Sequence, residues 1–227
     1  MPPPTQAVDR VTLKAAPFLY AIIDASMVGS RSLTDWVRLL AGPDKASLVQ
    51  WRFKGLTDAV ALLGAEELRV ATTEAGVLLF INDRPDIARI VGADGVHVGQ
   101  EDMAPADVRS LMPGGLIGVS THNQGQFEKA CEAPVDYIAV GPVFATTSKA
   151  NPDPEVGLSF VAWTAGKTTL PIVGIGGING GNAADVTRAG ASGIAVISEL
   201  MKAEDPDAAA RNLKSALVGR GITSRPA

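Results

Sequence analysis

The sequence has a single cysteine, few aromatic residues and no excess of positive charge. Cys131 stands alone, which excludes an intrachain disulfide framework and a cysteine-based zinc site and fits a reducing compartment. We interpret its side chain as a small buried apolar group. Twenty Lys and Arg oppose 24 Asp and Glu, for a net charge of −4, so the broad positive field of a nucleic-acid-binding protein is missing. An anionic ligand must therefore be held by a few local cations.

Long apolar runs are also missing. The apolar segment 18–23 stops at Asp24 and is far shorter than the ~18 residues of a membrane span. We therefore expect a cytoplasmic protein that binds no membrane and carries no targeting segment. The 227 residues suit one domain, predicted at 17–218, between flexible polar tails at 1–16 and 219–227.

Short β-rich runs alternate with helical patterns along the whole chain. The predicted strands are 19–24, 48–53, 78–83, 95–99, 116–121, 137–142, 172–177 and 193–198. The clearest predicted helices are 33–40, 104–111, 124–130, 182–189 and 207–217, whereas the segment between Lys54 and Leu78 is short and unusually apolar and does not define the second helix. Nearly continuous apolar strands between helices indicate a parallel sheet that is buried on both faces. Eight such units predict an α/β fold, a single (β/α)8 TIM barrel, with a doubly wound sheet as the alternative.

Polar residues follow almost every predicted strand, which favours the barrel. A barrel collects its chemistry at the carboxyl ends of all its strands, whereas a doubly wound sheet concentrates it at one switch point. The two histidines add little to the polar residues at the strand ends. His97 lies within an apolar strand, and we interpret it as a core residue. His122 is a secondary candidate only.

The second predicted strand carries a basic face. A period of two places Gln50, Arg52 and Lys54 on one side, with Trp51 and Phe53 on the other. Two neighbouring cations in a partly dry site favour a bound anion, so we predict a clamp for phosphate or diphosphate. The alternative is a half-exposed edge strand.

Carboxylates follow the third and fourth predicted strands. Asp83 comes after Asn82, and Asp102 lies just beyond the next strand. A few hard oxygen ligands beside a phosphate clamp suit Mg²⁺ shared between protein and substrate, so we predict these two aspartates as metal ligands. The alternative is that each aspartate caps the helix that follows.

Two further segments suit phosphate binding. The glycine-rich run 174–181 follows the seventh strand, and Ile197 and Ser198 end the eighth, where barrels often seat a phosphate. A tight turn alone would also explain the glycines. A hydroxyl-rich loop ending in Lys149 follows the sixth strand and suits closure over phosphates, although an ordinary polar loop would read the same way.

Six ordered motifs between about residues 18 and 217 resemble the thiamine-phosphate synthase family. They are Gln50-x-Arg52-x-Lys54, Ile81-Asn82-Asp83-Arg84-x-Asp86-Ile87-Ala88, Gly95-Val96-His97-x-Gly99-Gln100-Glu101-Asp102, Gly118-Val119-Ser120-Thr121-His122, Thr146-x-Ser148-Lys149 and Ile175-Gly176-Gly177-Ile178. The resemblance implies a TIM-barrel transferase that joins 4-amino-2-methyl-5-(diphosphomethyl)pyrimidine to a thiazole phosphate and releases diphosphate. It also implies a dissociative reaction, in which the C–O bond breaks before the thiazole nitrogen attacks.

The resemblance also implies roles for individual residues. The pyrimidine diphosphate would be held by Gln50, Arg52, Lys54, Asn82, Ser120 and Lys149, of which Arg52, Lys54, Ser120 and Lys149 would be catalytic. The thiazole phosphate would be held by Thr146, Thr147, Ser148, Gly177, Ile197 and Ser198, and Mg²⁺ by Asp83 and Asp102. Phe53 replaces a usual glutamate, and we expect it to face outward without a role in the chemistry.

Other functions fit the sequence less well. A thiazole tautomerase of the related barrel family typically lacks the metal carboxylates, and a sensor of thiamine phosphate has no need of a metal and diphosphate clamp. An unrelated phosphate-binding epimerase would need an acid and base pair that the sequence does not show. The oligomeric state does not follow from the sequence.

Overall fold

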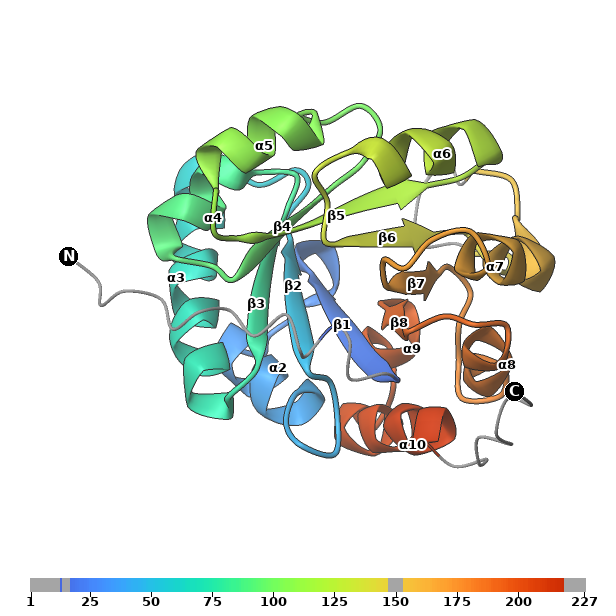
Figure 1. Cartoon of the computed structure of the whole chain (residues 1–227). Coiled ribbons are helices and arrows are strands. Elements are labelled where there is room, and N and C mark those ends of the chain that lie inside the picture. Colours follow the sequence, from blue (N-terminus) through green and yellow to red (C-terminus); the bar gives the residue numbers. More distant parts are fainter. Residues whose placement is uncertain (1–12, 14–16, 147–152, 219–227) are drawn as a thin grey trace.

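The computed structural model is a closed barrel of eight parallel strands surrounded by helices (Figure 1). It describes residues 13, 17–146 and 153–218, so most of both predicted tails lies outside the described residues. The strands are β1 (Phe18–Asp24), β2 (Leu48–Arg52), β3 (Leu78–Asn82), β4 (Gly95–Val98), β5 (Leu116–Thr121), β6 (Tyr137–Val140), β7 (Ile172–Ile175) and β8 (Gly193–Val196). They follow one another in chain order, and β8 pairs with β1 to close the ring. The TIM barrel is therefore confirmed, and the doubly wound alternative is wrong.

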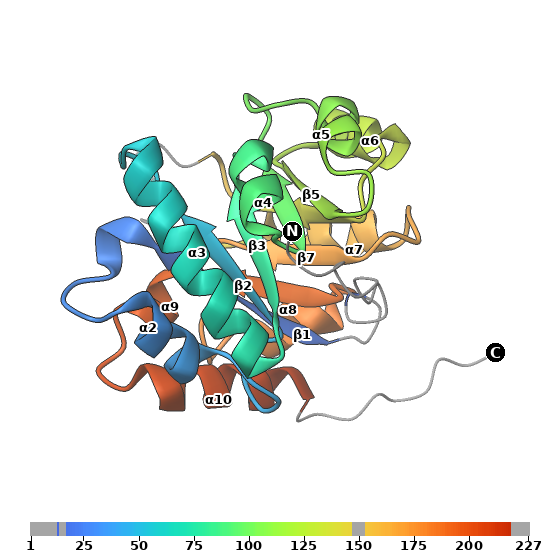
Figure 2. The same cartoon turned by 90° about the vertical axis from the view of Figure 1, so that its left-hand side faces the viewer.

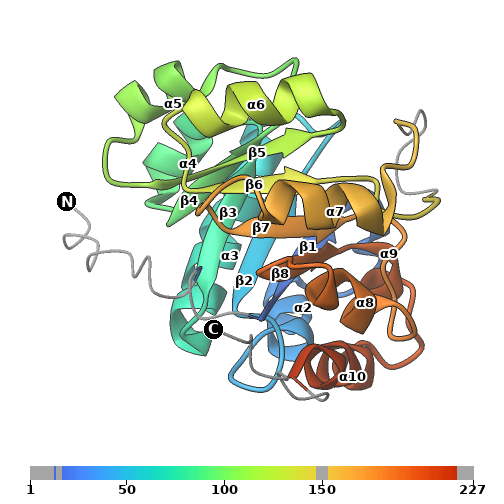
Figure 3. The ribbon, with the colours of Figure 1, turned by 45° about the vertical axis from the view of Figure 1, so that its right-hand side comes forward.

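The helices lie on the outside of the barrel. They are α2 (Leu33–Leu40), α3 (Asp58–Ala75), α4 (Pro85–Val91), α5 (Pro105–Leu111), α6 (Gln124–Glu132), α7 (Gly157–Ala165), α8 (Ala183–Arg188), the short α9 (Ser198–Met201) and α10 (Pro206–Val218), with a 3₁₀ turn, η1 (Ala25–Met27), after β1. The five predicted helices are confirmed to within two residues at each end. Figure 3 shows α7 and α8 lying along the outside of β7 and β8.

The segment that the sequence left uninterpreted forms the long helix α3, which lies over β2 and β3 (Figure 2). Its buried face is made of small residues and one leucine, Ala61, Ala65 and Leu68. Its outer face is also partly apolar, because Val60 and Leu63 are 50% and 66% exposed. Apolar residues on both faces weaken the 3.6-residue period, which is why the pattern alone did not reveal the helix.

Two apolar clusters stabilise the barrel, one inside it and one between it and the helices. Successive strand residues point to opposite sides, so Leu19 joins the outer cluster while Phe18 and Tyr20 join the inner one. Leu13 also packs in the inner cluster, so this residue of the predicted N-terminal tail contacts the barrel. Burial of each large apolar side chain stabilises the fold by about 1.5–3 kcal/mol.

Two aspartates tie the amino ends of the strands to the helices. Asp94 accepts hydrogen bonds from the Leu79 amide and from Arg69, both at 2.8 Å. Asp136 repeats the arrangement, since it accepts from the Ile117 amide at 2.9 Å and pairs with Arg109 at 2.6 Å. These ion pairs lie at the end of the barrel that serves stability, away from the carboxyl ends of the strands.

Two predictions about single side chains have opposite outcomes. Phe53 is only 8% exposed and packs in the outer cluster 5.9 Å from the Trp51 ring, so its outward direction is confirmed. Cys131 is exposed, so the interpretation as a buried apolar group is wrong. Helix α6 buries Phe127 and Ala130, and Cys131 lies about 100° further around the helix than Ala130, toward solvent. Within the described residues, no helix is long and apolar enough to cross a membrane.

Candidate active site

The carboxyl ends of the strands surround a cavity of about 890 Å³. Eleven predicted site residues from different strands and loops line it, namely Gln50, Arg52, Lys54, Asn82, Asp83, Asp102, Ser120, Thr146, Gly177, Ile197 and Ser198. The predicted site residues Thr147, Ser148 and Lys149 lie outside the described residues. The barrel thus gathers into one cavity predicted site residues that are up to 148 positions apart in the chain, since Gln50 and Ser198 both line it.

Strand β2 directs its polar face into this cavity, as its period of two predicts. Gln50, Arg52 and Lys54 all line the cavity, whereas Trp51 and Phe53 pack in the outer cluster. Because β2 pairs with both β1 and β3, the alternative of a half-exposed edge strand is wrong. The cavity therefore holds two cations on adjacent inward-facing positions.

Arg52 is oriented by Asp24, the last residue of β1, a partnership that the sequence did not reveal. The Asp24 carboxylate pairs with the Arg52 guanidinium and accepts hydrogen bonds from the Ser26 amide at 3.0 Å and the Ser26 hydroxyl at 2.6 Å. Burial acts to raise the pKa of Asp24, but the hydrogen bonds from Ser26 and the charge of Arg52 outweigh it and hold that pKa below its usual value. Asp24 thus stays ionised and fixes the guanidinium at the cavity wall.

Asp83 and Asp102 come together at the mouth of the cavity. The two carboxyl groups are close enough for each to influence the other's charge, and Lys54 Nζ lies 3.3 Å from Asp83 Oδ2. Burial and the neighbouring Asp102 carboxyl raise the pKa of Asp83 to about 6, although Lys54 opposes the shift. The backbone at Asp83 is left-handed, with φ of 63°, which turns the chain out of β3 toward the mouth.

These two aspartates fit a divalent cation. Neither caps a helix, because the capping positions of α4 and α5 are Arg84 and Ala104, so the capping alternative is wrong. Two carboxylates held against each other repel when both are ionised, and a shared cation relieves that repulsion. No cluster of three or more His, Cys, Asp or Glu side chains converges in the part of the chain that the structure describes. A donor set of two carboxylates suits Mg²⁺, which keeps places for water and substrate oxygens.

The glycine-rich turn after β7 forms part of the cavity wall. Gly176 and Gly177 have φ of 98° and 64°, a region that favours glycine. A Cβ atom at Gly177 would lie 2.4 Å from the Ala145 carbonyl oxygen, so a side chain would displace the neighbouring loop. The glycines therefore serve a tight turn and also bring bare backbone to the cavity, beside Ile197 and Ser198.

The floor of the cavity contains polar groups that the sequence analysis assigned to the core or passed over. His97 is confirmed as a core residue with hydrogen-bond partners, since its ring nitrogens lie 2.7 Å from the Tyr137 hydroxyl and 2.8 Å from Ser120 Oγ. Tyr20 and Tyr137 also line the cavity, and neither was singled out. The alternation of side chains along β1 could have revealed Tyr20. It lies four residues before Asp24 and therefore on the same side of the strand.

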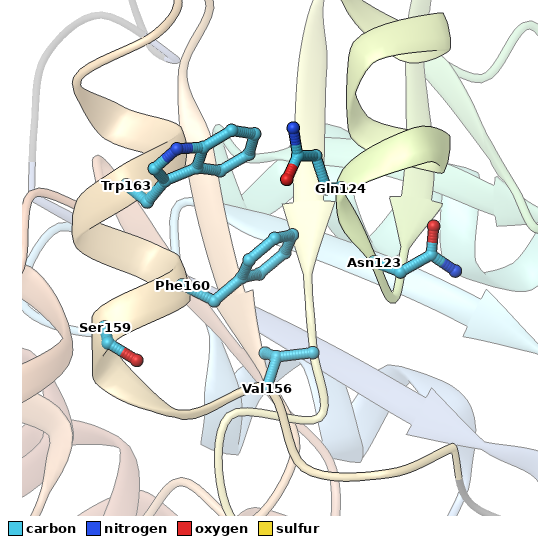
Figure 4. A pocket seen from close by; sticks show the side chains of 6 residues that line it. All are labelled: Asn123, Gln124, Val156, Ser159, Phe160 and Trp163. Carbon is cyan, nitrogen blue, oxygen red and sulfur yellow. The ribbon is translucent and has the colours of Figure 1, made fainter.

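A second hollow lies on the outside of the barrel, between the start of α6 and α7 (Figure 4). It is lined by Asn123, Gln124, Val156, Ser159, Phe160 and Trp163. None of these six side chains carries a charge that would hold a phosphate, and the Phe160 and Trp163 rings stack with their centroids 5.6 Å apart. The chemistry that the sequence predicts therefore belongs to the mouth of the barrel.

Known proteins are similar to this chain in sequence and in fold. The sequence model of the family described as thiamine monophosphate synthase matches residues 19–200. A thiamine-phosphate synthase of Chloroflexus aurantiacus is 44% identical over 199 residues, which cover 87% of this chain and 91% of that protein. One of Methanoculleus marisnigri is 40% identical over 208 residues, 91% of this chain and 98% of that protein.

Solved structures of known proteins are similar to this fold. The thiamine phosphate pyrophosphorylase from Pyrococcus furiosus superposes with a TM-score of 0.81 at 31% identity, covering 91% of this chain and 98% of that one. A 4-hydroxy-2-oxoglutarate aldolase superposes with a TM-score of 0.71 at 15% identity, covering 92% of this chain and 98% of that one, and this likeness shows the shared barrel alone. With a family match over most of its length and relatives above 40% identity, this chain belongs to the thiamine-phosphate synthase family.

Proposed function

We propose that this protein is a magnesium-dependent thiamine-phosphate synthase. It would join 4-amino-2-methyl-5-(diphosphomethyl)pyrimidine to 4-methyl-5-(2-phosphoethyl)thiazole and release diphosphate. With the carboxylated form of the thiazole, the carboxyl group would leave as CO₂ in addition. The observation that carries the proposal is the meeting of two cations, Arg52 and Lys54, with two carboxylates, Asp83 and Asp102, at one cavity. The two substrates carry three phosphate groups between them, and this cavity combines local cations with the bare backbone of a glycine turn.

The chain's own residues would act mainly by charge neutralisation and positioning. The C–O bond to the diphosphate breaks first, and the diphosphate leaves with the electron pair toward Arg52 and Lys54. The guanidinium offers a planar fork for two phosphate oxygens, and the ammonium offers a mobile point charge. A magnesium ion held by Asp83 and Asp102 would neutralise further charge on the diphosphate. Such preorganised electrostatic groups supply a large part of many enzymatic rate enhancements.

The second half of the reaction requires placement of the thiazole. Its ring nitrogen donates a lone pair to the pyrimidine methylene carbon and becomes the quaternary nitrogen of the product, so no proton has to be removed. Gln50 and Ser120 would hold the pyrimidine, and Asn82 would contact its diphosphate beside Asp83. Gly177, Ile197 and Ser198 would seat the thiazole phosphate, with Thr146, Thr147 and Ser148 from the loop after β6, and Lys149 of the same loop would hold the pyrimidine diphosphate. Holding both reactants in line removes much of the entropic barrier to a two-substrate reaction.

A tautomerase of the related barrel family is the main alternative. It is disfavoured because a proton shift on the thiazole has no leaving diphosphate, and so does not require Arg52 and Lys54 beside the paired carboxylates. A thiamine-phosphate sensor is disfavoured for a similar reason, since product binding needs no group that stabilises a departing diphosphate.

The decisive experiment measures diphosphate release from the purified protein. The reactions contain the pyrimidine diphosphate, the thiazole phosphate and Mg²⁺, together and with each left out in turn. Release that requires all three, with thiamine phosphate as the organic product, supports the synthase. Tight binding of both compounds without release would instead indicate a sensor, and conversion of a thiazole tautomer without diphosphate would indicate a tautomerase.

A further inference from the structure

A continuous chain of hydrogen bonds crosses the barrel interior beneath the charged mouth. Gln50 Nε2 donates to the Tyr20 hydroxyl at 2.7 Å, and the hydroxyls of Tyr20 and Tyr137 lie 3.3 Å apart. The Tyr137 hydroxyl lies 2.7 Å from His97 Nδ1, and His97 Nε2 lies 2.8 Å from Ser120 Oγ. We call these five residues the relay. Both of its ends, Gln50 and Ser120, line the cavity and are predicted to hold the pyrimidine.

The packing around the relay leaves its members little freedom. Tyr20 and Tyr137 are 1% and 0% exposed. The centroids of their rings lie 5.5 and 5.9 Å from the centroid of the Phe80 ring. Gly118 faces Tyr137 across neighbouring strands, and a Cβ atom there would lie 2.0 Å from the tyrosine ring, so glycine is required for the ring to reach His97. Burial raises the pKa of both tyrosines above the usual phenol range. Both therefore remain neutral hydroxyls that donate and accept.

The chemistry of the groups makes the relay directional. A hydroxyl donates one hydrogen, and a neutral imidazole donates from one nitrogen and accepts at the other. When Gln50 donates its amide N–H to Tyr20, each member in turn donates to the next, and His97 Nε2–H donates to Ser120. Gln50 then has its carbonyl oxygen left for a ligand, and Ser120 has its hydrogen.

The opposite direction is equally complete when the Gln50 amide turns over, so that its oxygen instead of Nε2 faces Tyr20. Ser120 then donates to His97 Nε2, and the donations run back through both tyrosines to the carbonyl oxygen of Gln50. The Gln50 amide hydrogens and the Ser120 lone pairs are now left for a ligand. Gln50 also keeps its second amide hydrogen in the first direction. What the direction decides is therefore whether the Gln50 carbonyl oxygen and the Ser120 hydrogen both face the ligand or are both used within the relay.

We propose that Tyr20, Tyr137 and His97 are positioning residues whose relay couples Gln50 to Ser120, so that the cavity floor matches the amidine edge of an aminopyrimidine. That edge carries one donor, the amino group, and one acceptor, the adjacent ring nitrogen. The inference rests on the proposed function and adds the device that selects the heterocycle. A 4-oxo pyrimidine, with a carbonyl oxygen and a ring N–H, presents the same pair in reverse order, which the reversed relay accepts. A 4-methoxy pyrimidine has no hydrogen to donate at this edge, so it leaves unpaired the Gln50 carbonyl oxygen of the first direction or the Ser120 lone pair of the second.

The test removes the central hydroxyl with Tyr137→Phe, which keeps the ring. The KM for the pyrimidine diphosphate should rise by about tenfold, the size expected for loss of a neutral hydrogen bond, while the KM for the thiazole phosphate stays unchanged. Inhibition constants are then measured for the 4-amino, 4-oxo and 4-methoxy forms of the 2-methyl-5-(phosphomethyl)pyrimidine. In the wild type, the inhibition constants of the 4-amino and 4-oxo forms should agree within a few-fold, and the 4-methoxy form should bind much more weakly. In Tyr137→Phe, the ratio of the 4-methoxy constant to the 4-amino constant should fall by about fivefold or more. The reason is that Gln50 and Ser120 are no longer coupled and orient independently.

Thr72→Val is the matched control, since it removes another fully buried hydroxyl, one that bonds within α3 to the Leu68 carbonyl. It should leave both KM values and the preference unchanged. Tyr20→Phe breaks the relay at a second link and replaces Tyr137→Phe if that variant does not fold. An active wild type combined with an unchanged KM and an unchanged preference in the folded variant would overturn the relay alone. A wild type that releases no diphosphate would overturn the proposed function instead.

Discussion

The ammonium of Lys54 lies 3.3 Å from the carboxylate of Asp83, joining the predicted diphosphate clamp to the predicted magnesium site. Lys54 is 61% exposed and Asp83 only 19%, so the lysine is the mobile partner at the rim. Lys54 occupies the place beside Asp83 where a cation would bind. Asp83 in turn occupies the place beside Lys54 where a phosphate would bind. Under the proposed function, arrival of a magnesium diphosphate would replace this ion pair, with the cation on Asp83 and the phosphate on Lys54.

Removal of Arg52 tests the clamp directly. Arg52→Ala should lower kcat/KM for the pyrimidine diphosphate by about two to three orders of magnitude, as loss of a preorganised electrostatic group commonly does. Arg52→Lys keeps the charge without the fork and should recover part of the loss. Arg38→Ala, at an exposed arginine of α2, is the control and should be neutral. Near-wild-type turnover in Arg52→Ala would rule out the clamp.

Asp102→Ala should also lower kcat/KM for the pyrimidine diphosphate by about two to three orders of magnitude, because it removes one of two predicted metal ligands. Raised Mg²⁺ concentration should restore part of the activity, which distinguishes a weakened metal site from a damaged fold. Asp107→Ala removes an exposed aspartate five residues further along the chain and should leave the Mg²⁺ requirement unchanged. Equal Mg²⁺ dependence in Asp102→Ala and the wild type would contradict the assignment.

Asp24→Asn tests whether the orientation of Arg52 matters. The amide keeps the shape of the carboxylate but not its charge, so the guanidinium loses its ionic partner. We expect kcat/KM for the pyrimidine diphosphate to fall about tenfold, since charge-assisted hydrogen bonds are worth about 1.5–3 kcal/mol and only positioning is lost. The KM for the thiazole phosphate, measured at saturating pyrimidine diphosphate, should not change. A change confined to the thiazole KM would show that Asp24 acts elsewhere.

Magnesium affinity should depend on pH through Asp83. Its pKa is raised to about 6, so the carboxyl holds a proton below that pH and must lose it to bind the cation. The apparent Mg²⁺ affinity, measured by titration calorimetry, should rise from pH 5 to 7 and level off above. Asp83→Asn should remove this dependence. A wild-type affinity that is constant across that range would contradict the assignment of Asp83 as a ligand.

The same raised pKa should make the metal-free fold less stable at neutral pH. Between the usual Asp pKa of about 4 and the raised value of about 6, the folded state binds more protons than the unfolded state, so stability falls as pH rises through that window. Asp83→Asn should therefore raise the Tm of the metal-free protein at pH 7 by about 2–4 °C, and asparagine tolerates the left-handed backbone. A lower Tm would show that the Lys54 ion pair outweighs the repulsion from Asp102.

Phe53→Glu should separate stability from chemistry. The substitution introduces the residue that is usual in the family into an outer cluster where Phe53 is only 8% exposed beside Trp51. Loss of the buried ring should lower the free energy of unfolding by about 3 kcal/mol, measured by denaturant titration. The kcat of the folded protein should remain unchanged, because the side chain faces away from the cavity. A large loss of kcat would show that the outer position communicates with the site.

Much of the site could be predicted from short-range patterns. The period of two along residues 48–53 placed Gln50 and Arg52 together, and a barrel directs all strand ends to one face, which brought Asp83 near Asp102. Long-range pairings could not be predicted in this way. Tyr20 and Tyr137 are 117 positions apart in the chain, and no local pattern indicates that their hydroxyls meet.

The sequence by itself determined the order of strands and helices and the side of each strand that bears charge, because these depend on periodicity and on residues close in the chain. It favoured the barrel over a doubly wound sheet, but closure itself is the pairing of β1 with β8 at opposite ends of the chain. Only the tertiary structure decided which polar groups pair. Asp24 reaches Arg52, Lys54 reaches Asp83, and His97 bridges Tyr137 to Ser120 only after the strands close. It also decided that Cys131 faces solvent and that α3 forms from an apolar segment. Those outcomes depend on contacts between distant segments, which packing selects and local patterns do not encode.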